Sequence, residues 1–128
     1  MSGGYTHITL AQLAIEEVCF KREGLLHDDA KQALGYWKKF CIVGAVAPDY
    51  PYLDATDSNS CAWADAMHKR HAVALLRNGV ARIRDLADVN VRQKCTAWLF
   101  GFASHVATDS ALQNPLSLPD KYRQKPSA

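Results

Sequence analysis

Apolar residues recur every three or four positions along the last third of the chain, and the same stripe ends in two polar side chains. The stripe consists of Val91, Cys95, Trp98, Phe102, His105 and Asp109. This spacing predicts one long helix whose core-facing side ends in an imidazole and a carboxylate. Because burying these two groups without partners is costly, we expect other parts of the chain to meet them.

Helical spacing also covers residues 5–22, 28–43 and 61–86, and no stretch alternates between apolar and polar residues as a strand would. Gly24 and Gly44 follow the first two stretches, and Asn78-Gly79 marks a break or a kink in the third. The candidate N-terminal caps are Thr6 or Thr9, Asp28, one of Asp57, Ser58 and Asn59, and one of Asp88 and Asn90. These elements predict an all-α fold, a compact bundle of four to five helices.

Residues 1–115 are expected to form this helical domain, and residues 116–128 a loosely ordered tail with little apolar content. Residues 50–60 form the one long loop of the domain. Loops of this length are usually either functional or disordered, and the tyrosines and prolines in and just before this one favour an ordered structure.

The 128 residues suffice for one domain, and a formal net charge of +2 is too small to indicate binding to nucleic acid. The N-terminal region lacks the pattern of a secretory signal, and no apolar run reaches the roughly 18 residues of a membrane span. The chain as written is therefore expected to be cytoplasmic, with export by another route left open. Its four widely spaced cysteines are expected to be reduced, and small buried hydrophobes rather than ligands.

His105 and Asp109 lie one helical turn apart and could bind one metal ion, since both residue types are good zinc ligands. Asp49, His68 and His7 are candidate co-ligands from three other elements, which a helical bundle can bring to one place. Each has an ordinary alternative: a turn residue for Asp49, a surface group for His68 and a polar residue near a helix start for His7. His71 is a fallback ligand in case His68 points away.

Four blocks of the sequence resemble the zinc-dependent phospholipases C, whose fold is related to that of the S1/P1-type nucleases. They occur in the order found in that family, and the resemblance covers roughly residues 5–115. The blocks are Tyr5-Thr6-His7-Ile8, Val43-Gly44-Ala45-Val46-Ala47-Pro48-Asp49-Tyr50-Pro51-Tyr52-Leu53, Trp63-Ala64-Asp65-Ala66-Met67-His68 and Trp98-Leu99-Phe100-Gly101-Phe102-Ala103-Ser104-His105-Val106-Ala107-Thr108-Asp109.

The resemblance implies an all-α, phospholipase C-like fold. It also implies an enzyme that uses one or two zinc ions to hydrolyse phosphodiester bonds, typically in phospholipids. By motif, Asp49, His68, His105 and Asp109 would hold one zinc. Asp109 would also bridge to a second zinc, which His7 helps to bind. The metals would activate a water that attacks phosphorus, and Asp49 is the candidate catalytic residue that orients this water or acts as general base.

The sequence departs from the family pattern at the third zinc. Leu112-Gln113-Asn114-Pro115 stands where the family places a His before Pro, and neither His nor Glu follows Asp109. We therefore expect two metals at most. One alternative is a catalytically degenerate, shortened relative that binds metal structurally and acts as a lipid- or protein-binding module. A nuclease-like activity is a weaker alternative because no basic groove is indicated. A homo-oligomer that gains ligands or covers apolar surface stays open.

Tyr50, Tyr52 and Leu53 are candidate substrate-binding residues at the mouth of the site, and they are equally well explained as the small core of their own loop. Asp65 lies three residues before His68 and is a candidate for orienting its imidazole. A surface ion pair with Lys69 is the commoner role for an acidic residue at that spacing.

Overall fold

The structure, a computed structural model of the chain, describes residues 3–68 and 71–113. These residues are mostly helical and contain no strand, which confirms the all-α class. The elements are α1 (Gly4–Glu16), the π-helical turn η1 (Glu17–Lys21), α2 (Asp28–Tyr36), α3 (Lys38–Val46), the 3-10 helix η2 (Ala47–Leu53), α4 (Ser58–His68), α5 (Ala72–Arg84) and α6 (Val89–Gln113). The predicted tail, residues 116–128, lies outside the described residues.

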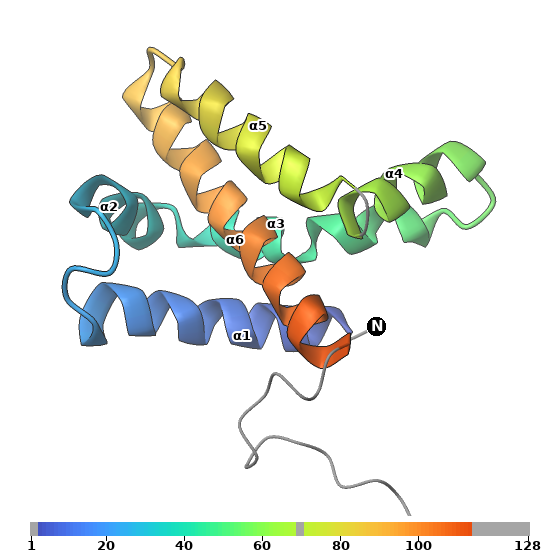
Figure 1. The fold of residues 1–128 in the computed structure, drawn as a ribbon, viewed down its shortest axis with the longest axis horizontal. Coiled ribbons are helices and arrows are strands. Elements are labelled where there is room, and N and C mark those ends of the chain that lie inside the picture. The colour runs from blue at the N-terminus through green and yellow to red at the C-terminus, as the bar shows by residue number, and fades with distance from the viewer. Residues whose placement is uncertain (1–2, 69–70, 114–128) are drawn as a thin grey trace, which may run out of the picture.

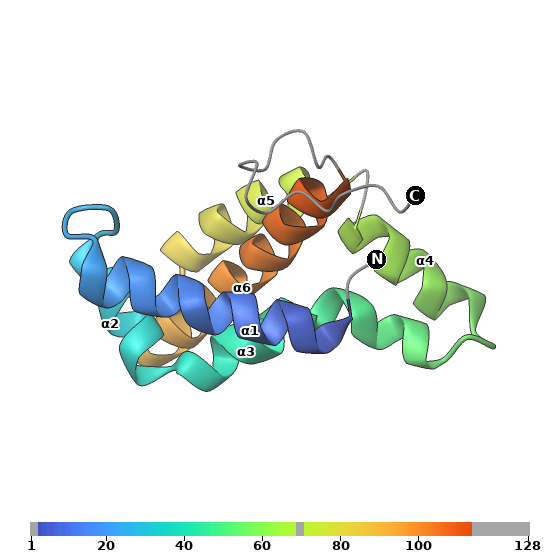
Figure 2. The same ribbon diagram turned by 90° about the horizontal axis from the view of Figure 1, so that it is seen from below.

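Helix α6 lies at the centre of the arrangement. It crosses α3 near the middle of the molecule, and α5 runs alongside it (Figure 1). Seen from below, α6 lies between α5 and the pair formed by α1 and α3 (Figure 2). Helix α4 and η2 project to one side as a helical hairpin (Figure 1). The core between α1, α2, α3 and α6 is built on buried Ile15, Leu34, Cys41 and Ala97.

The crossing of α3 and α6 is unusually close because each helix presents a glycine to the other. A Cβ atom on Gly44 would lie 2.9 Å from the carbonyl carbon of Trp98. A Cβ atom on Gly101 would lie 2.7 Å from the amide nitrogen of Ala45. Both glycines are buried, and a side chain at either would meet backbone rather than a movable side chain. The two backbones are thereby brought into direct contact.

The helix predicted over 28–43 is two helices, since the backbone leaves the helical region at Trp37 (φ −119°, ψ 36°). The Trp37 indole Nε1–H donates to the Gln93 side chain on α6 at 3.1 Å, and the Lys94 ammonium lies 4.6 Å from the indole ring. The bend gives α2 and α3 separate directions, and both contact α6. The expected boundary at Gly44 is also wrong, because α3 continues to Val46.

The third predicted helix is divided as well, but not at Asn78-Gly79. Helix α4 ends at His68, α5 begins at Ala72, and Gly79 lies inside α5. Its lack of a side chain serves packing, because a Cβ atom there would lie 2.8 Å from the Leu99 side chain on α6. The predicted loop over 50–60 is ordered but largely helical, since η2 and the start of α4 occupy most of it.

Two of the four predicted caps are confirmed. The Asp57 carboxylate accepts from the Asn59 amide at 2.9 Å, and the Asp88 carboxylate accepts from the Val91 amide at 3.0 Å. The cap at Thr6 or Thr9 is wrong because α1 already begins at Gly4 and both residues lie inside it. The cap at Asp28 is wrong because the His27 ring accepts from the Asp29 amide and Asp28 is the first helical residue.

None of the helices in the described part of the chain combines the length and the apolar character needed to cross a membrane.

Candidate metal centre

Four elements bring the five predicted metal ligands together. The ligands are His7 on α1, Asp49 on η2, His68 at the end of α4, and His105 and Asp109 on α6. Potential ligand atoms of Asp49, His68 and His105 lie within 4.8 Å of one another, as do those of His7, His105 and Asp109. His7 and His105 are fully buried, Asp109 is nearly so, and the Asp49 side chain is 26% exposed. Solvent therefore reaches the cluster at Asp49.

Local structure explains where the ligands stand. His105 and Asp109 are one turn apart on α6, and their Nε2 and Oδ2 atoms lie 3.1 Å apart. Pro48 stands at the start of η2 and presets the backbone for the turn that carries Asp49. The close crossing of α3 and α6 at Gly44 and Gly101 brings the end of α3 against α6, so that the Ala45 carbonyl reaches the His105 ring.

Backbone carbonyls orient two of the three imidazoles. The His105 Nδ1–H donates to the Ala45 carbonyl at 2.6 Å, and the His68 Nδ1–H donates to the Ala64 carbonyl at 2.7 Å. With the proton on Nδ1, each neutral ring presents the lone pair of Nε2 to the centre of the cluster. Fixing the tautomer of a metal-binding histidine through its second nitrogen is a common feature of metal sites.

The two Nε2 atoms of His68 and His105 lie only 3.0 Å apart. In neutral rings whose protons are on Nδ1, neither Nε2 has a hydrogen to donate, so two lone pairs face each other. The Asp49 Oδ1 atom lies 2.9 Å from the His68 Nε2, which adds a negatively charged oxygen to the same place. This arrangement of electron pairs and charge suits a cation between the rings.

The spacing of the donor atoms also fits a tetrahedral ion. Zinc with bonds of about 2.0–2.1 Å holds its ligand atoms about 3.3 Å apart. The contacts of His68 Nε2 and His105 Nε2 with each other, with Asp49 Oδ1 and with Asp109 Oδ2 range from 2.9 to 3.8 Å. The donor atoms of Asp49, His68 and His105 therefore fit one zinc ion, and Asp109 Oδ2 lies close to both imidazoles as a further donor.

Asp109 faces both halves of the cluster. Its Oδ2 atom lies toward His105 and His68, whereas its Oδ1 atom lies 3.2 Å from the His7 Nε2. The His7 ring stacks on the His105 ring with centroids 3.6 Å apart. Burial, and then repulsion from His105, lower the pKa of His7 below its usual value, which favours the neutral form that can bind a metal.

The candidate residues next to the cluster differ in their exposure and in their contacts. Tyr50 is half exposed, Leu53 is almost fully exposed, and the Tyr52 ring lies against His68 with centroids 5.4 Å apart. The predicted direct contact of Asp65 with the His68 ring is wrong, because the His68 Nδ1–H donates to the Ala64 carbonyl; Asp65 instead accepts a hydrogen bond from the Tyr52 hydroxyl at 2.6 Å. The hydrogen bond to Asp65, with some burial, raises the pKa of Tyr52 to about 12.

His71 is exposed at the start of α5, so the fallback to this residue is not needed. The predicted partner of Asp65 in an ion pair, Lys69, lies outside the described residues.

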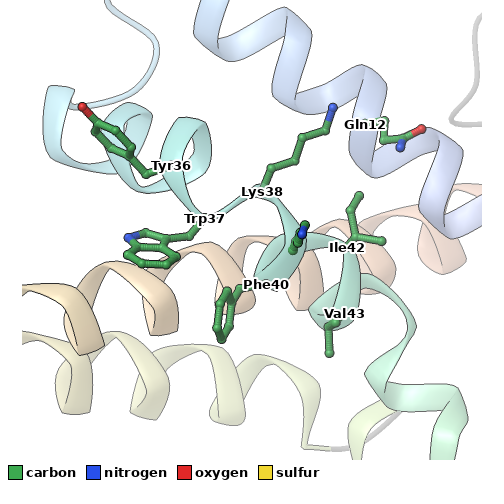
Figure 3. Close-up of a pocket in the computed structure, with 8 residues that line it drawn as sticks. Gln12, Tyr36, Trp37, Lys38, Phe40, Ile42 and Val43 are labelled. Atoms are coloured by element: carbon green, nitrogen blue, oxygen red, sulfur yellow. The ribbon is translucent and has the colours of Figure 1, made fainter.

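A separate, largely apolar pocket of about 730 Å³ lies where α1, α2 and α3 meet, with Trp37, Phe40 and Val43 in its wall (Figure 3). None of the five clustered side chains lines it.

Three contacts of the site were not predicted from the sequence: the hydrogen bonds of His105 and His68 to the Ala45 and Ala64 carbonyls, and the contact between Tyr52 and Asp65. Backbone acceptors have no signature in the sequence. A signal for the contact did exist, because Tyr52 and Asp65 each lie three residues from a predicted ligand.

The fold and the cluster thus define an all-α protein with a candidate His/Asp metal site. The family model for zinc-dependent phospholipase C matches residues 6–111, which is most of the chain, and the chain belongs to this family. Neither the comparison with curated proteins nor the comparison with solved structures gives a match.

Proposed function

We propose that this protein hydrolyses phosphodiester bonds of the phospholipase C type with a zinc ion held by Asp49, His68, His105 and Asp109. The observation that supports this most directly is the approach of two tautomer-fixed Nε2 atoms to 3.0 Å beside a carboxylate. Family membership supports zinc as the metal and a phospholipid or a small phosphodiester as the substrate. His7 and the Oδ1 atom of Asp109 would serve a second ion.

Bound zinc would supply charge stabilisation at the phosphoryl oxygens and would lower the pKa of a coordinated water. The protein's own contribution is to hold the donor atoms and to limit water access. The Ala45 and Ala64 carbonyls fix His105 and His68 in the tautomer that can bind metal. Burial lowers the pKa of His7, which favours the neutral ring that can bind metal.

Asp49 is the group we assign to the attacking water. It is the most exposed of the five clustered side chains, so one of its oxygens can meet solvent while Oδ1 faces His68. A carboxylate in this place can accept a hydrogen bond from water and turn its lone pair toward phosphorus. Tyr50 and Leu53, exposed on the same short helix, would contact the substrate's non-reacting part.

The test begins with zinc per chain in protein purified without chelators, followed by hydrolysis of a chromogenic phosphodiester. His105→Ala is expected to lose bound zinc and activity together, since it removes a donor atom and the contact to Ala45. The matched control is His71→Ala, which removes an exposed histidine outside the cluster and should leave both unchanged. Asp49→Asn is expected to lower turnover more than it lowers zinc content.

Wild-type protein without bound zinc would refute the metal site. Stoichiometric zinc without hydrolysis of any phosphodiester would refute the catalytic assignment and leave a structural metal.

A further inference from the structure

The hydroxyl of Tyr52 and the carboxylate of Asp65 form a second connection between the two elements that carry Asp49 and His68. The Tyr52 Oη–H donates to Asp65 Oδ1 at 2.6 Å, a short distance typical of a hydrogen bond to a charged acceptor. Tyr52 belongs to η2 and Asp65 to α4. The contact therefore links the element of one proposed ligand to the element of another.

The register of the two contacts is the same on both elements. Tyr52 follows Asp49 by three residues on a 3-10 helix, where side chains three apart lie above one another. Asp65 precedes His68 by three residues on an α-helix, where such side chains share a face. The Asp49–His68 contact at 2.9 Å and the Tyr52–Asp65 contact at 2.6 Å are thus two parallel connections across one antiparallel helical pair.

Helix η2 needs such a connection more than an α-helix would. The hydrogen-bond geometry of a 3-10 helix is poorer than that of an α-helix, and Pro51 within η2 has no N–H to donate. Asp49 is also the most exposed member of the cluster, so packing holds it less firmly than the buried histidines. The Tyr52 ring, which lies against the His68 ring, is in position to hold both ligands.

We propose that Tyr52 and Asp65 are positioning residues that keep the donor atoms of Asp49 and His68 at metal-binding distance. The proposal rests on the proposed metal site. It places Tyr52 beside the metal centre as a support for its ligands, in addition to any contact with substrate. Partners that orient metal ligands typically contribute about 10- to 100-fold to metal affinity.

The experiment measures the zinc dissociation constant by competition with a chromogenic chelator, at a temperature where every variant is folded. Tyr52→Phe keeps the ring against His68 and loses only the hydroxyl, and we expect it to bind zinc about 10-fold more weakly or worse. Asp65→Ala should weaken zinc binding to the same extent. The double variant should bind zinc no more weakly than either single variant, because each substitution removes the same hydrogen bond. Asp65→Asn keeps an acceptor oxygen and should retain most of the affinity.

Tyr36→Phe and Asp85→Asn are the matched controls, since both residues are exposed and lie on other parts of the fold. The proposal is overturned if Tyr52→Phe binds zinc within twofold of wild type, or if the effects of Tyr52→Phe and Asp65→Ala add up in the double variant. If only the catalytic assignment fails, the wild type binds zinc but does not hydrolyse a phosphodiester, and Tyr52→Phe and Asp65→Ala still bind zinc more weakly than the wild type. A wild type that binds no zinc overturns both proposals.

Discussion

Gly101→Ala tests the close crossing of α3 and α6. The added methyl group would lie 2.7 Å from the Ala45 amide nitrogen and would also meet the Cys41 carbonyl group. Nonbonded carbon contacts are optimal at about 3.5–4.0 Å, so the helices must separate by about an ångström or remain compressed. Overpacking costs about 1–3 kcal/mol, and more where the neighbour is backbone.

The substitution also gains about 1 kcal/mol of helix propensity; because the clash is with backbone we expect the upper end of that cost, which leaves a net destabilisation of about 2 kcal/mol. For a chain of this size, that corresponds to a Tm lower by about 6–10 °C. Thermal and urea unfolding of the metal-free protein measure it. Gly35→Ala is the control, because a Cβ atom there has open space and the helical position should gain about 0.5–1 kcal/mol.

A Gly101→Ala protein as stable as the Gly35→Ala protein would refute the close crossing. The zinc affinity gives a second readout, since moving α3 away from α6 carries the Ala45 carbonyl away from the His105 ring. We expect weaker zinc binding even at temperatures where the variant is fully folded.

Two further predictions concern titration. Because the pKa of His7 is lowered in the fold, the unfolded chain binds the proton more readily, and the free energy of unfolding of metal-free protein should fall as the pH drops below about 6.5. In His7→Gln the pH dependence measured by urea unfolding should be shallower, and an unchanged slope would contradict the assignment. Burial raises the pKa of Cys41 to about 11, so at pH 8 its alkylation in native protein should be much slower than that of partly exposed Cys61. Peptide mapping by mass spectrometry measures the alkylation rates of the two cysteines, and equal rates would show that Cys41 is accessible.

Local signals account for what could be predicted of the fold. The start of α6 was predictable because a long apolar stripe follows a capping aspartate, Asp88. The division at Trp37 was not, because the apolar spacing continues across it and the indole at the bend hydrogen-bonds to Gln93, a residue 56 positions away. Gly79 resembled a helix breaker, but its role is to admit the Leu99 side chain of α6.

The candidate site likewise has a part that follows from local sequence and a part that depends on how the elements pack. The distance between His105 and Asp109 follows from one helical turn and was predictable without a fold. The approach of His7, Asp49 and His68 depends on how four elements pack. Their places on separate elements made them candidates, and the family resemblance then favoured them over their ordinary alternatives. Their service as ligands remains a proposal. Contacts such as that of Tyr52 with Asp65 join two elements and become visible only when both are in place.

The clustered side chains begin at residue 7 on the first helix and end at residue 109 on the last described one. During synthesis His7 would leave the ribosome first and Asp109 last, and contacts between such distant residues form late in folding. A complete donor set therefore exists only after α1, η2, α4 and α6 have assembled. An ion that binds this set and not the unfolded chain would stabilise the assembled state by mass action, so metal uptake would report that folding is complete.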